Sequence, residues 1–488
     1  MMRKANSMAF TTLILAAGAG TRMNSSVPKA AHTLLGKPLI RWVIDAAYAS
    51  KSDYVITVVG HEREQVLSLV ADTTVVFQEE LKGTGHAVMM ARAQLETLAE
   101  KDPSHTLLVL CGDTSLLTVS TINSLVASHE DQHAAASVVT FITDDPTGYG
   151  RIIRNAQGLI ESIIEEKDAT ANERAITEVN SGMYCFDLNT LLASLDSLDT
   201  NNAQGEYYLT DVIATIRQTG GVVQAYLCDD KDEMLGVNDR VQLAQATAVA
   251  QQRINRVHML AGVTMLDPAS VWIEPDVTLG TDVEILPLTL LKGTTTIGSG
   301  CTIGPNTRIV DSTVGSNCVI EESILVGATL EDTVRIGPRA YLRPGTIMRT
   351  GSRAGTHVEI KKSDIGANSK VPHLSYLGDT TLGQNVNIGA GAITCNYDGV
   401  SKHPTTIGDR SFIGSDTMFV APVTIGCDVV TGAGSVITRD VPDGALAIER
   451  NEQRILENWT QRKRSREAEH EKTIEPAQAE DGLDTTIE

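Results

Sequence analysis

The chain has 488 residues, which is too many for one ordinary hydrophobic core, so we expect two or three domains. Its formal net charge of −21 argues against binding to nucleic acid or to anionic membrane surfaces. The seven cysteines are scattered and form no CxxC pair, which argues against a disulfide framework or a zinc site and favours a reducing cytoplasm.

Apolar runs alternate with helical patterns from residue 10 to about residue 230. Four runs predict strands, at 11–17, 54–60, 105–113 and 135–142, and three segments predict helices, at 38–50, 85–100 and 121–130. This alternation is typical of a parallel sheet covered by helices on both faces, with ligands beyond the carboxyl ends of the strands. We therefore predict an α/β, Rossmann-like domain over residues 1–238.

The first of these runs leads into "LILAAGAGTRM", residues 13–23, for which three interpretations compete. A secretion signal would need a longer apolar run, and the same residues also fit a buried strand that enters a Gly turn. A dinucleotide-binding loop needs G-x-G-x-x-G, but Met23 stands at the third glycine position. The third interpretation is a different phosphate-binding turn, in which backbone N–H groups approach the phosphate and Arg22 and Lys29 supply positive charge.

Residues 239–262 predict a long helix that connects two domains. Leu243, Ala246, Ala250, Ile254 and Val257 recur every three or four residues and form one apolar stripe. Such a helix would be roughly 35 Å long if unbroken.

A repeat of six residues dominates residues 263–449. Aliphatic residues recur in a fixed phase, slip out of register and recover it, beginning with Ile273, Leu279, Ile285, Leu291, Ile297, Ile303 and Ile309. A period of six fits a coil of three short strands per turn, each pointing one aliphatic side chain inward, which is a left-handed parallel β-helix. Residues 394–406 interrupt the repeat, so we expect them to leave the coil as a loop on a binding face.

The remaining residues, 450–488, carry no repeat. They begin with a basic segment and end in an acidic, polar one, so we expect a C-terminal arm whose last 20 or so residues are disordered. Trp459 in this arm has two interpretations: it pins the arm to the coil, or it covers a site on a neighbouring chain.

A resemblance to a known family supports the third interpretation of the opening stretch. Residues 15–30, "LAAGAGTRMNSSVPKA", resemble the signature of sugar-1-phosphate nucleotidyltransferases. Seven further segments agree with it in chain order, at 78–87, 111–113, 144–152, 165–170, 179–183, 201–211 and 236–240. Together with the repeats, they make the chain similar to bifunctional bacterial N-acetylglucosamine-1-phosphate uridyltransferase/glucosamine-1-phosphate acetyltransferases, up to about residue 460.

The resemblance implies a nucleotide site in the first domain. Its UTP- and sugar-binding residues would be Leu15, Ala16, Ala17, Gly18, Lys29, Gln78, Gly83, Thr84, Gly150, Glu165, Asn180 and Asn238. Lys29 and Arg22 would be the catalytic cations, and the oxygens of Asp113 and Asn238 would hold Mg²⁺. Taken singly, Asp113 could be a solvated carboxylate and Asn238 a helix N-cap. Cys111 departs from the family, in which an aromatic residue more often precedes the Gly-Asp pair.

The resemblance also implies an acetyltransferase site on the coil. His373 would be the general base, because a neutral imidazole can take a proton from an amine near pH 7. Glucosamine-1-phosphate would be bound by Arg343, Lys361, Tyr376, Asn387 and Lys402, and acetyl-CoA by Ala390, Asn396, Tyr397, Ser415, Ala433 and Arg450. Glu359 would orient His373, and either a backbone N–H or the Ser415 hydroxyl would stabilise the thioester oxygen. Such coils are expected to form homotrimers.

Three functions compete for the whole chain. The first is a bifunctional enzyme that makes UDP-N-acetylglucosamine, a precursor of cell-wall polymers, from glucosamine-1-phosphate, acetyl-CoA and UTP. The second is a nucleotidyltransferase whose coil serves only oligomerisation or regulation, but a scaffold has no use for His373 and Lys361. The third is a non-enzymatic regulatory subunit, and the intact Lys29 and Asp113 argue against it.

Overall fold

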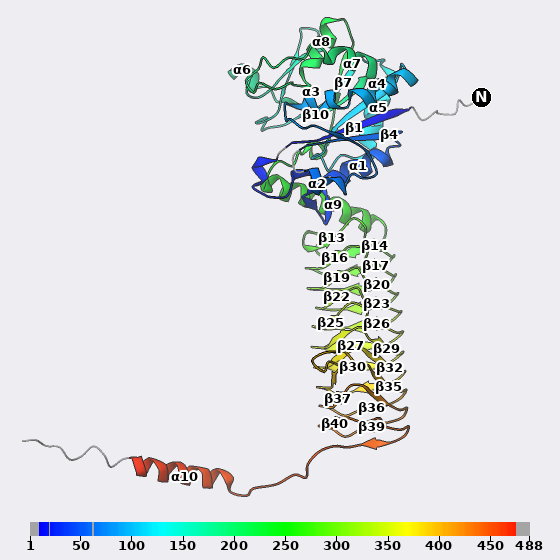
Figure 1. The fold of residues 1–488 in the computed structure, drawn as a ribbon, viewed down its shortest axis with the longest axis vertical. Helices are drawn as coiled ribbons and strands as arrows, with labels where there is room; N and C mark the ends of the chain where they lie inside the picture. Colours follow the sequence, from blue (N-terminus) through cyan, green and yellow to red (C-terminus); the bar gives the residue numbers. More distant parts are fainter. Residues whose placement is uncertain (1–8, 19, 61–62, 475–488) are drawn as a thin grey trace, which may run out of the picture.

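The computed structural model describes residues 9–18, 20–60 and 63–474. The head (residues 9–238) and the prism (263–449) lie along one axis with helix α9 between them, and the arm (450–474) turns away sideways from the far end of the prism (Figure 1). The signal-like residues 1–8 and the acidic residues 475–488 lie outside the described residues. None of the helices within the described ranges combines the length and apolar character that a membrane span requires.

A mixed sheet forms the centre of the head. Its strands run in the order β11-β7-β10-β6-β1-β4-β5, with the hairpin of β8 and β9 attached to β10. The bounds are β1 Phe10–Ala16, β4 Tyr54–Val59, β5 Thr74–Phe77, β6 Thr106–Cys111, β7 Ala136–Ile142, β8 Arg151–Arg154, β9 Ile160–Ile164, β10 Glu178–Asp187 and β11 Val223–Leu227. The prediction of a parallel sheet was wrong for β10, which runs antiparallel to both β6 and β7.

Helices cover both faces of this sheet, as predicted. Leu107 and Val109 of β6 pack into one core, while Leu108 and Leu110 pack into another on the opposite face. The helices are α1 Leu39–Ala49, α2 Arg63–Leu67, α3 Thr84–Met90, α4 Arg92–Lys101, α5 Val119–Asp131, α6 Ala171–Arg174, α7 Leu188–Leu195 and α8 Asp211–Gln218. The helix predicted at 85–100 is divided into α3 and α4 at Ala91. Short elements complete the head: 3-10 turns at Thr21–Met23, Lys29–Ala31 and Lys231–Met234, and strands β2 Thr33–Leu34 and β3 Lys37–Pro38.

Helix α9, Arg240–Leu260, joins the head to the prism. Its N-cap is Asp239, whose side chain accepts a hydrogen bond from the Gln242 N–H, so Asn238 is free for another role. Ala246 and Ala250 are buried against the head. Val257, which was predicted to lie on the same apolar stripe, is exposed to solvent. The buried amides of Gln251 and Asn255 donate to backbone carbonyls at the top of the prism.

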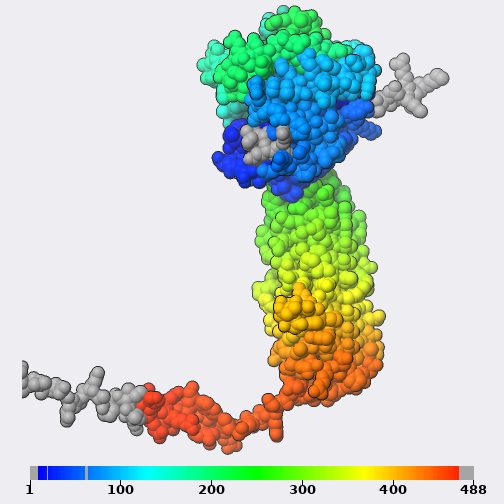
Figure 2. Space-filling view, in the orientation of Figure 1, coloured from blue at the N-terminus to red at the C-terminus, as the bar shows by residue number. Residues whose placement is uncertain are grey.

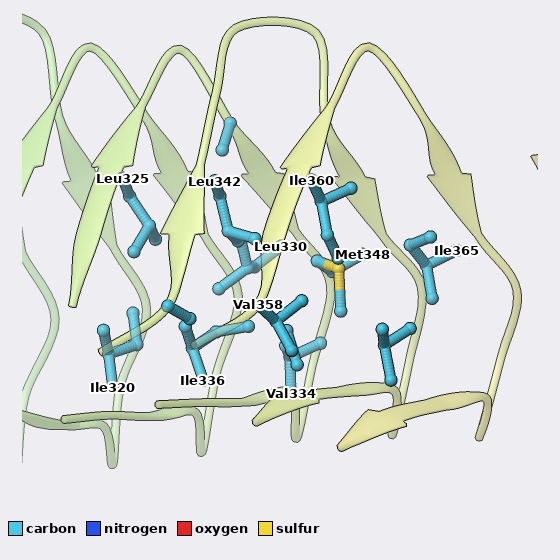
Figure 3. Close-up of a cluster of buried hydrophobic side chains, with 14 of the residues drawn as sticks. Ile320, Leu325, Leu330, Val334, Ile336, Leu342, Met348, Val358, Ile360 and Ile365 are labelled. Carbon is cyan, nitrogen blue, oxygen red and sulfur yellow. The ribbon is translucent and has the colours of Figure 1, made fainter. Parts of the chain in front are cut away.

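The prism is a parallel β-helix whose three faces are separate sheets, as predicted (Figure 1). Face C takes β12, β15, β18, β21, β24, β27, β30, β33, β36, β39 and β41 in order; face D takes β13 and every third strand to β40; face E takes β14 and every third strand to β38. Inside, the aliphatic side chains stack coil upon coil (Figure 3). The tight corners are residues with positive φ, such as Asn317 and Asn368, in which Asn accepts left-handed backbone angles.

The strands of the prism are short. They are β12 Thr264–Met265, β13 Trp272–Ile273, β14 Thr278–Leu279, β15 Glu284–Ile285, β16 Leu290–Lys292, β17 Thr296–Ile297, β18 Thr302–Ile303, β19 Arg308–Val310, β20 Thr313–Val314, β21 Val319–Ile320, β22 Ile324–Val326, β23 Thr329–Leu330, β24 Arg335–Ile336, β25 Tyr341–Leu342, β26 Ile347–Met348, β27 Arg353–Thr356, β28 Glu359–Lys361, β29 Asp364–Ile365, β30 Lys370–His373, β31 Tyr376–Gly378, β32 Thr380–Leu382, β33 Asn387–Ile388, β34 Ile393–Cys395, β35 Thr405–Ile407, β36 Phe412–Ile413, β37 Met418–Val420, β38 Val423–Ile425, β39 Val430–Thr431, β40 Val436–Ile437 and β41 Leu446–Ala447.

The slips in the six-residue repeat have a structural cause. Leu291 pairs with Ile309 one full coil later, but Ile309 pairs with Leu325, so that coil is two residues shorter. The residues are lost at the corners, while the inward side chains remain stacked and buried. The repeat in the sequence therefore shifts although the packing inside does not.

The segment that interrupts the repeat forms a hairpin loop, residues 396–404, between β34 and β35. Tyr397 and Lys402 pair across it as an isolated antiparallel bridge. The loop rises from the surface of the prism, where it appears as an orange patch against yellow coils (Figure 2). The prediction that it leaves the coil is confirmed.

The arm leaves the far end of the prism and carries helix α10, Trp459–Ile474 (Figure 1). The expected disorder of the last 20 or so residues was wrong for residues 469–474, which continue this helix. Trp459 is 51% exposed, and the Lys463 ammonium lies 5.9 Å from the centre of its ring. The interpretation that Trp459 pins the arm to its own coil was therefore wrong.

Two candidate active sites

The head contains a cavity of about 430 Å³ at the carboxyl ends of β1 and β6. Nine predicted site residues line it: Leu15, Ala16, Ala17, Gly18, Lys29, Gln78, Gly83, Thr84 and Asp113. Ala30, Leu81, Ala87, Cys111, Gly112 and Glu206 complete the lining. Of these six, Cys111 alone was singled out in the sequence; the other five lie in the segments that carry the family resemblance but were not predicted as site residues.

A cation position lies at one end of this cavity. The Lys29 Nζ atom lies 2.5 Å from Asp113 Oδ2 and 3.1 Å from Asn238 Oδ1. Lys29, Asp113 and Asn238 come from the turn after β1, the end of β6 and the residue before the N-cap of α9. A carboxylate and an amide oxygen that converge in this way also fit a hard divalent cation, because such ions prefer oxygen ligands.

The turn before Lys29 depends on glycine. Gly20 has a φ of 60°, and a Cβ atom at this position would lie 2.7 Å from the Cβ atom of Lys29. The following 3-10 turn, Thr21–Met23, ends with Asn24 in the left-handed region. Arg22 is exposed on this turn and is not among the residues that line the cavity.

Gln78 and Thr84, the residues predicted to read the uracil, line the same cavity. The Gln78 side-chain amide donates to the Gly83 carbonyl at 3.1 Å and lies 3.0 Å from His86 Nδ1. Thr84 Oγ1 accepts a hydrogen bond from the Leu209 N–H. These contacts hold Gln78 and Thr84 in fixed orientations, as selective recognition of a base edge requires. His86 was missed in the sequence, where nothing but its position two residues after Thr84 could have indicated it.

The three predicted sugar-binding residues of the head meet beside the cavity. The Asn180 N–H donates to the Gly150 carbonyl at 2.8 Å, and Glu165 accepts a hydrogen bond from the Thr210 hydroxyl at 3.2 Å. Burial raises the pKa of the Glu165 carboxyl. The Cys111 thiol donates to the Gly182 carbonyl and so joins this group to the cavity. Burial raises the pKa of that thiol to about 12, so it stays protonated near pH 7.

On the prism, five predicted residues form a column along one corner of successive coils: His373, Ala390, Ser415, Ala433 and Arg450. The Gly391 N–H donates to the His373 carbonyl, the Asp416 N–H to the Ala390 carbonyl and the Gly434 N–H to the Ser415 carbonyl. Arg450 then donates to the carbonyl of Ala433. The structure thus brings His373, Ala390, Ser415, Ala433 and Arg450 onto one edge, and His373, Ser415, Ala433 and Arg450 are exposed there.

A cluster of positive charge occupies face D, around the corner from His373. Lys361 ends β28, Arg343 follows β25 in the previous coil, and the loop brings Lys402 beside them. The pKa of Lys361 is lowered, chiefly because the Lys402 ammonium lies next to it. Arg343 donates to Glu359 at 2.8 Å, so the predicted orientation of His373 by Glu359 is not what the structure shows.

The remaining predicted residues flank these two groups. Glu359 and Tyr376 are paired neighbours at the first positions of β28 and β31 on face D. Asn387 lies on face C, one coil beyond the strand of His373. Asn396 is buried at the base of the loop, and its amide donates to Asp379 at 2.6 Å. Gly378 leaves room for this contact, because a Cβ atom there would lie 2.6 Å from the Asn396 amide nitrogen. Tyr397 is exposed on the loop.

Comparison with known proteins gives a match for the head and a match for the prism. Residues 11–255 match the family model of nucleotidyl transferases, and residues 404–439 match that of the hexapeptide repeat of succinyl-transferase. A protein named Bifunctional protein GlmU from Heliobacterium modesticaldum is 51% identical over 93% of this chain and 98% of its own length. The protein of the same name from Syntrophomonas wolfei is 48% identical over 92% of this chain and 99% of its own length. The one from Mycolicibacterium vanbaalenii is 46% identical over 93% of this chain and 93% of its own length. The chain therefore belongs to the family of bifunctional GlmU proteins.

Proposed function

We propose that the two sites carry out successive reactions on one amino sugar. The prism acetylates glucosamine-1-phosphate with acetyl-CoA, and the head transfers UMP from UTP to the resulting N-acetylglucosamine-1-phosphate, releasing pyrophosphate. The observation that supports this most directly is that two separate groups of residues with different chemistry lie on one chain whose relatives match it over nearly its whole length. The corresponding division of the chain is 1–238, 239–262, 263–449 and 450–488.

In the head, the sugar phosphate oxygen attacks the α-phosphorus of UTP, a new P–O bond forms, and the bond to the pyrophosphate oxygen breaks. Lys29 neutralises negative charge that builds up on the phosphates. Asp113 and Asn238 would hold Mg²⁺, which supplies further charge neutralisation when bound. Gln78 and Thr84 orient the uracil, and Glu165, Asn180 and Gly150 the acetamido sugar. We assign Arg22 to the outer phosphates, because it is exposed beside the turn that carries Lys29.

In the prism, the amine attacks the thioester carbonyl of acetyl-CoA. The N–C bond forms, the C–S bond breaks, and free CoA leaves with its thiol protonated. His373 takes the proton that the amine loses and passes it to the leaving sulfur, which regenerates the neutral imidazole. Arg343, Lys361 and Lys402 neutralise the phosphate, with Tyr376 and Asn387 beside the sugar. Acetyl-CoA lies along the column of Ala390, Ser415, Ala433 and Arg450, with Asn396 and Tyr397 near the thioester.

A homotrimer fits this second site. The column is exposed on a single chain, so a neighbouring prism is needed to close a groove over it. Each trimer would then carry three acetyltransferase sites built from more than one chain. The cysteines scattered over the sequence fit a cytoplasmic enzyme.

The test is to incubate the protein with glucosamine-1-phosphate, acetyl-CoA, UTP and Mg²⁺, and to measure the release of free thiol and of pyrophosphate separately. We expect His373→Ala to stop thiol release from glucosamine-1-phosphate and acetyl-CoA while sparing pyrophosphate release from N-acetylglucosamine-1-phosphate and UTP. Asp113→Ala should do the reverse. A wild-type protein that released pyrophosphate but never thiol would instead indicate a nucleotidyltransferase on a structural coil.

A further inference from the structure

The hairpin loop of the prism contains an Asp–His pair to which neither proposed reaction assigns a role. His403 Nε2 lies 2.7 Å from Asp398 Oδ2. Hydrogen bonds from the Ser401 N–H, and then from the His403 ring, lower the pKa of the Asp398 carboxyl. An ionised carboxylate only accepts hydrogen bonds, so the His403 ring must donate through Nε2.

The pair closes the loop across its two strands. Asp398 Oδ1 accepts hydrogen bonds from the Val400 and Ser401 N–H groups at 2.8 and 2.6 Å. One oxygen of the Asp398 carboxylate therefore accepts hydrogen bonds from the tip of the loop, and the other accepts a hydrogen bond from His403 on the returning strand. On that strand Lys402 directly precedes His403, and the Lys402 backbone is paired with Tyr397.

The position of Lys402 carries an electrostatic cost. Its ammonium lies close enough to Lys361 to lower the pKa of that residue, and Arg343 acts on Lys361 in the same direction. Like charges repel, so an exposed lysine on an unrestrained loop would move away from Lys361 into solvent. Asp379 attracts Lys361, but its carboxylate already accepts from Asn396 and lies 3.6 Å from Lys362. Backbone contacts already tie the Lys402 strand to the strand of Asn396, through the bridge to Tyr397 and the His403 N–H donating to the Asn396 carbonyl at 2.8 Å. The Asp398–His403 pair adds a side-chain restraint to the same strand.

We propose that Asp398 and His403 are positioning residues that hold Lys402 against the repulsion of Lys361, and so preform a site for a doubly charged phosphate monoester. This inference rests on the proposed acetyltransferase function. Two ammonium groups held side by side before binding suit a dianion better than a neutral sugar, because the restraint is already in place when the phosphate arrives. The other strand of the loop is tied to the prism by Asn396 on Asp379, and the His403 backbone N–H bond to the Asn396 carbonyl does not involve the His403 ring. Removing the ring should therefore leave acetyl-CoA contacts on that strand in place.

The test is His403→Ala in the full-length protein, with steady-state acetyl transfer measured for both substrates. We expect KM for glucosamine-1-phosphate to rise about three- to tenfold, as for the loss of one partly exposed charged contact. The acetyl-CoA KM and kcat should stay within about twofold, because binding and not chemistry is affected. His403→Gln, which keeps an amide N–H donor for Asp398, should restore much of the lost affinity.

Controls separate this inference from the function on which it rests. His133→Asn replaces an exposed histidine in a left-handed turn of the head and should leave acetyl transfer unchanged. Pyrophosphate release from the same His403→Ala sample reports an intact head. An unchanged KM for glucosamine-1-phosphate, or an equal rise in both KM values, would overturn the positioning role. A wild-type protein without acetyl transfer would instead refute the proposed function.

Discussion

The head and the prism present their candidate sites in opposite ways. In the head, the ends of β1 and β6, the turn carrying Lys29 and the start of α9 surround a cavity within one chain. On the prism, His373, Ser415, Ala433 and Arg450 lie exposed along one edge. The head cavity is enclosed by residues of one chain. The prism has a cavity of about 390 Å³ beside its loop, lined in part by Lys402 and His403, but the exposed column from His373 to Arg450 lies outside that cavity. On the proposed function, a neighbouring prism covers this column, whereas the head site needs no second chain.

The largest predicted effect comes from surface substitutions that would prevent one prism from associating with another. Phe412, Val430 and Leu446 are register neighbours on face C with large exposed fractions, so they are candidates for contact with another prism. We expect Phe412→Asp with Leu446→Asp to yield monomers in sedimentation and to lower acetyl transfer by about 100-fold or more, because the proposed neighbouring prism no longer covers the column and orients acetyl-CoA. Uridyl transfer should remain within about twofold.

The control for this variant is Val222→Asp, which changes an equally exposed aliphatic residue of the head. It should leave both the sedimentation and the two activities as in the wild type. A fully active acetyltransferase monomer would show that one prism is sufficient and that the contrast between the two regions is wrong.

A matched pair of glycine substitutions should affect the two activities separately. An added Cβ atom at Gly20 would press on Lys29, and one at Gly378 would press on the Tyr376 hydroxyl and the Asn396 amide. We expect Gly20→Ala to lower uridyl transfer, and Gly378→Ala acetyl transfer, by roughly 10- to 100-fold, since displacements of about 1 Å have such effects. Both kcat/KM values should be measured on each variant, and loss of both activities in either one would contradict two independent sites.

The head should also be the more acid-sensitive region. Burial lowers the pKa of His129, on α5, to about 4, whereas an unfolded histidine takes up its proton near 6.5. The unfolded state therefore binds the proton first as the pH falls from 6.5 to 4, and the head loses roughly 3 kcal/mol of stability at most over this window. Hydrogen exchange should show opening of β6 and β7 before the prism strands, and His129→Gln should weaken that dependence. Equal acid sensitivity of head and prism would contradict it.

The smallest effect is expected at Cys111. Its thiol lines the cavity and donates only to the Gly182 carbonyl, a bond that a serine hydroxyl can replace. Cys111→Ser should change the uridyltransferase kcat/KM by less than about threefold. Because its pKa is raised to about 12, the thiol should also react slowly with maleimide at pH 7, which mass spectrometry of labelled peptides would measure.

Local periodicity was sufficient to predict most of the architecture. Continuous apolar runs identified four buried strands of the head, β1, β4, β6 and β7, and the six-residue repeat identified the coil. The column on the prism also follows from the sequence once the coil is known, because His373, Ala390, Ser415 and Ala433 are separated by one coil each, with the loop included in the second interval. Strand β10 was not among the predicted strands, and a strand's burial pattern would not have shown its antiparallel direction, because that pattern is the same in either direction.

Contacts between distant side chains were the part that periodicity could not supply. Lys29, Asp113 and Asn238 meet because three separate chain segments end at one edge of the sheet. The pairing of Glu359 with Arg343, rather than with His373, depends on which strand lies in the preceding coil and on side-chain direction. The resemblance to a family placed these residues in one of two sites, but only the folded chain assigned their partners.

The length of the prism sets the distance between the two proposed sites, and so the path of N-acetylglucosamine-1-phosphate from one to the other. Six coil spacings separate β13, at the top of the prism, from β31, which carries Tyr376, and each adjacent pair of strands is about 4.8 Å apart. On the proposed function, the acetylated sugar is thus made roughly 29 Å below β13, and an intermediate that leaves the prism has to diffuse to the head to reach the uridylyl donor. Any other protein with affinity for that compound can intercept it on the way.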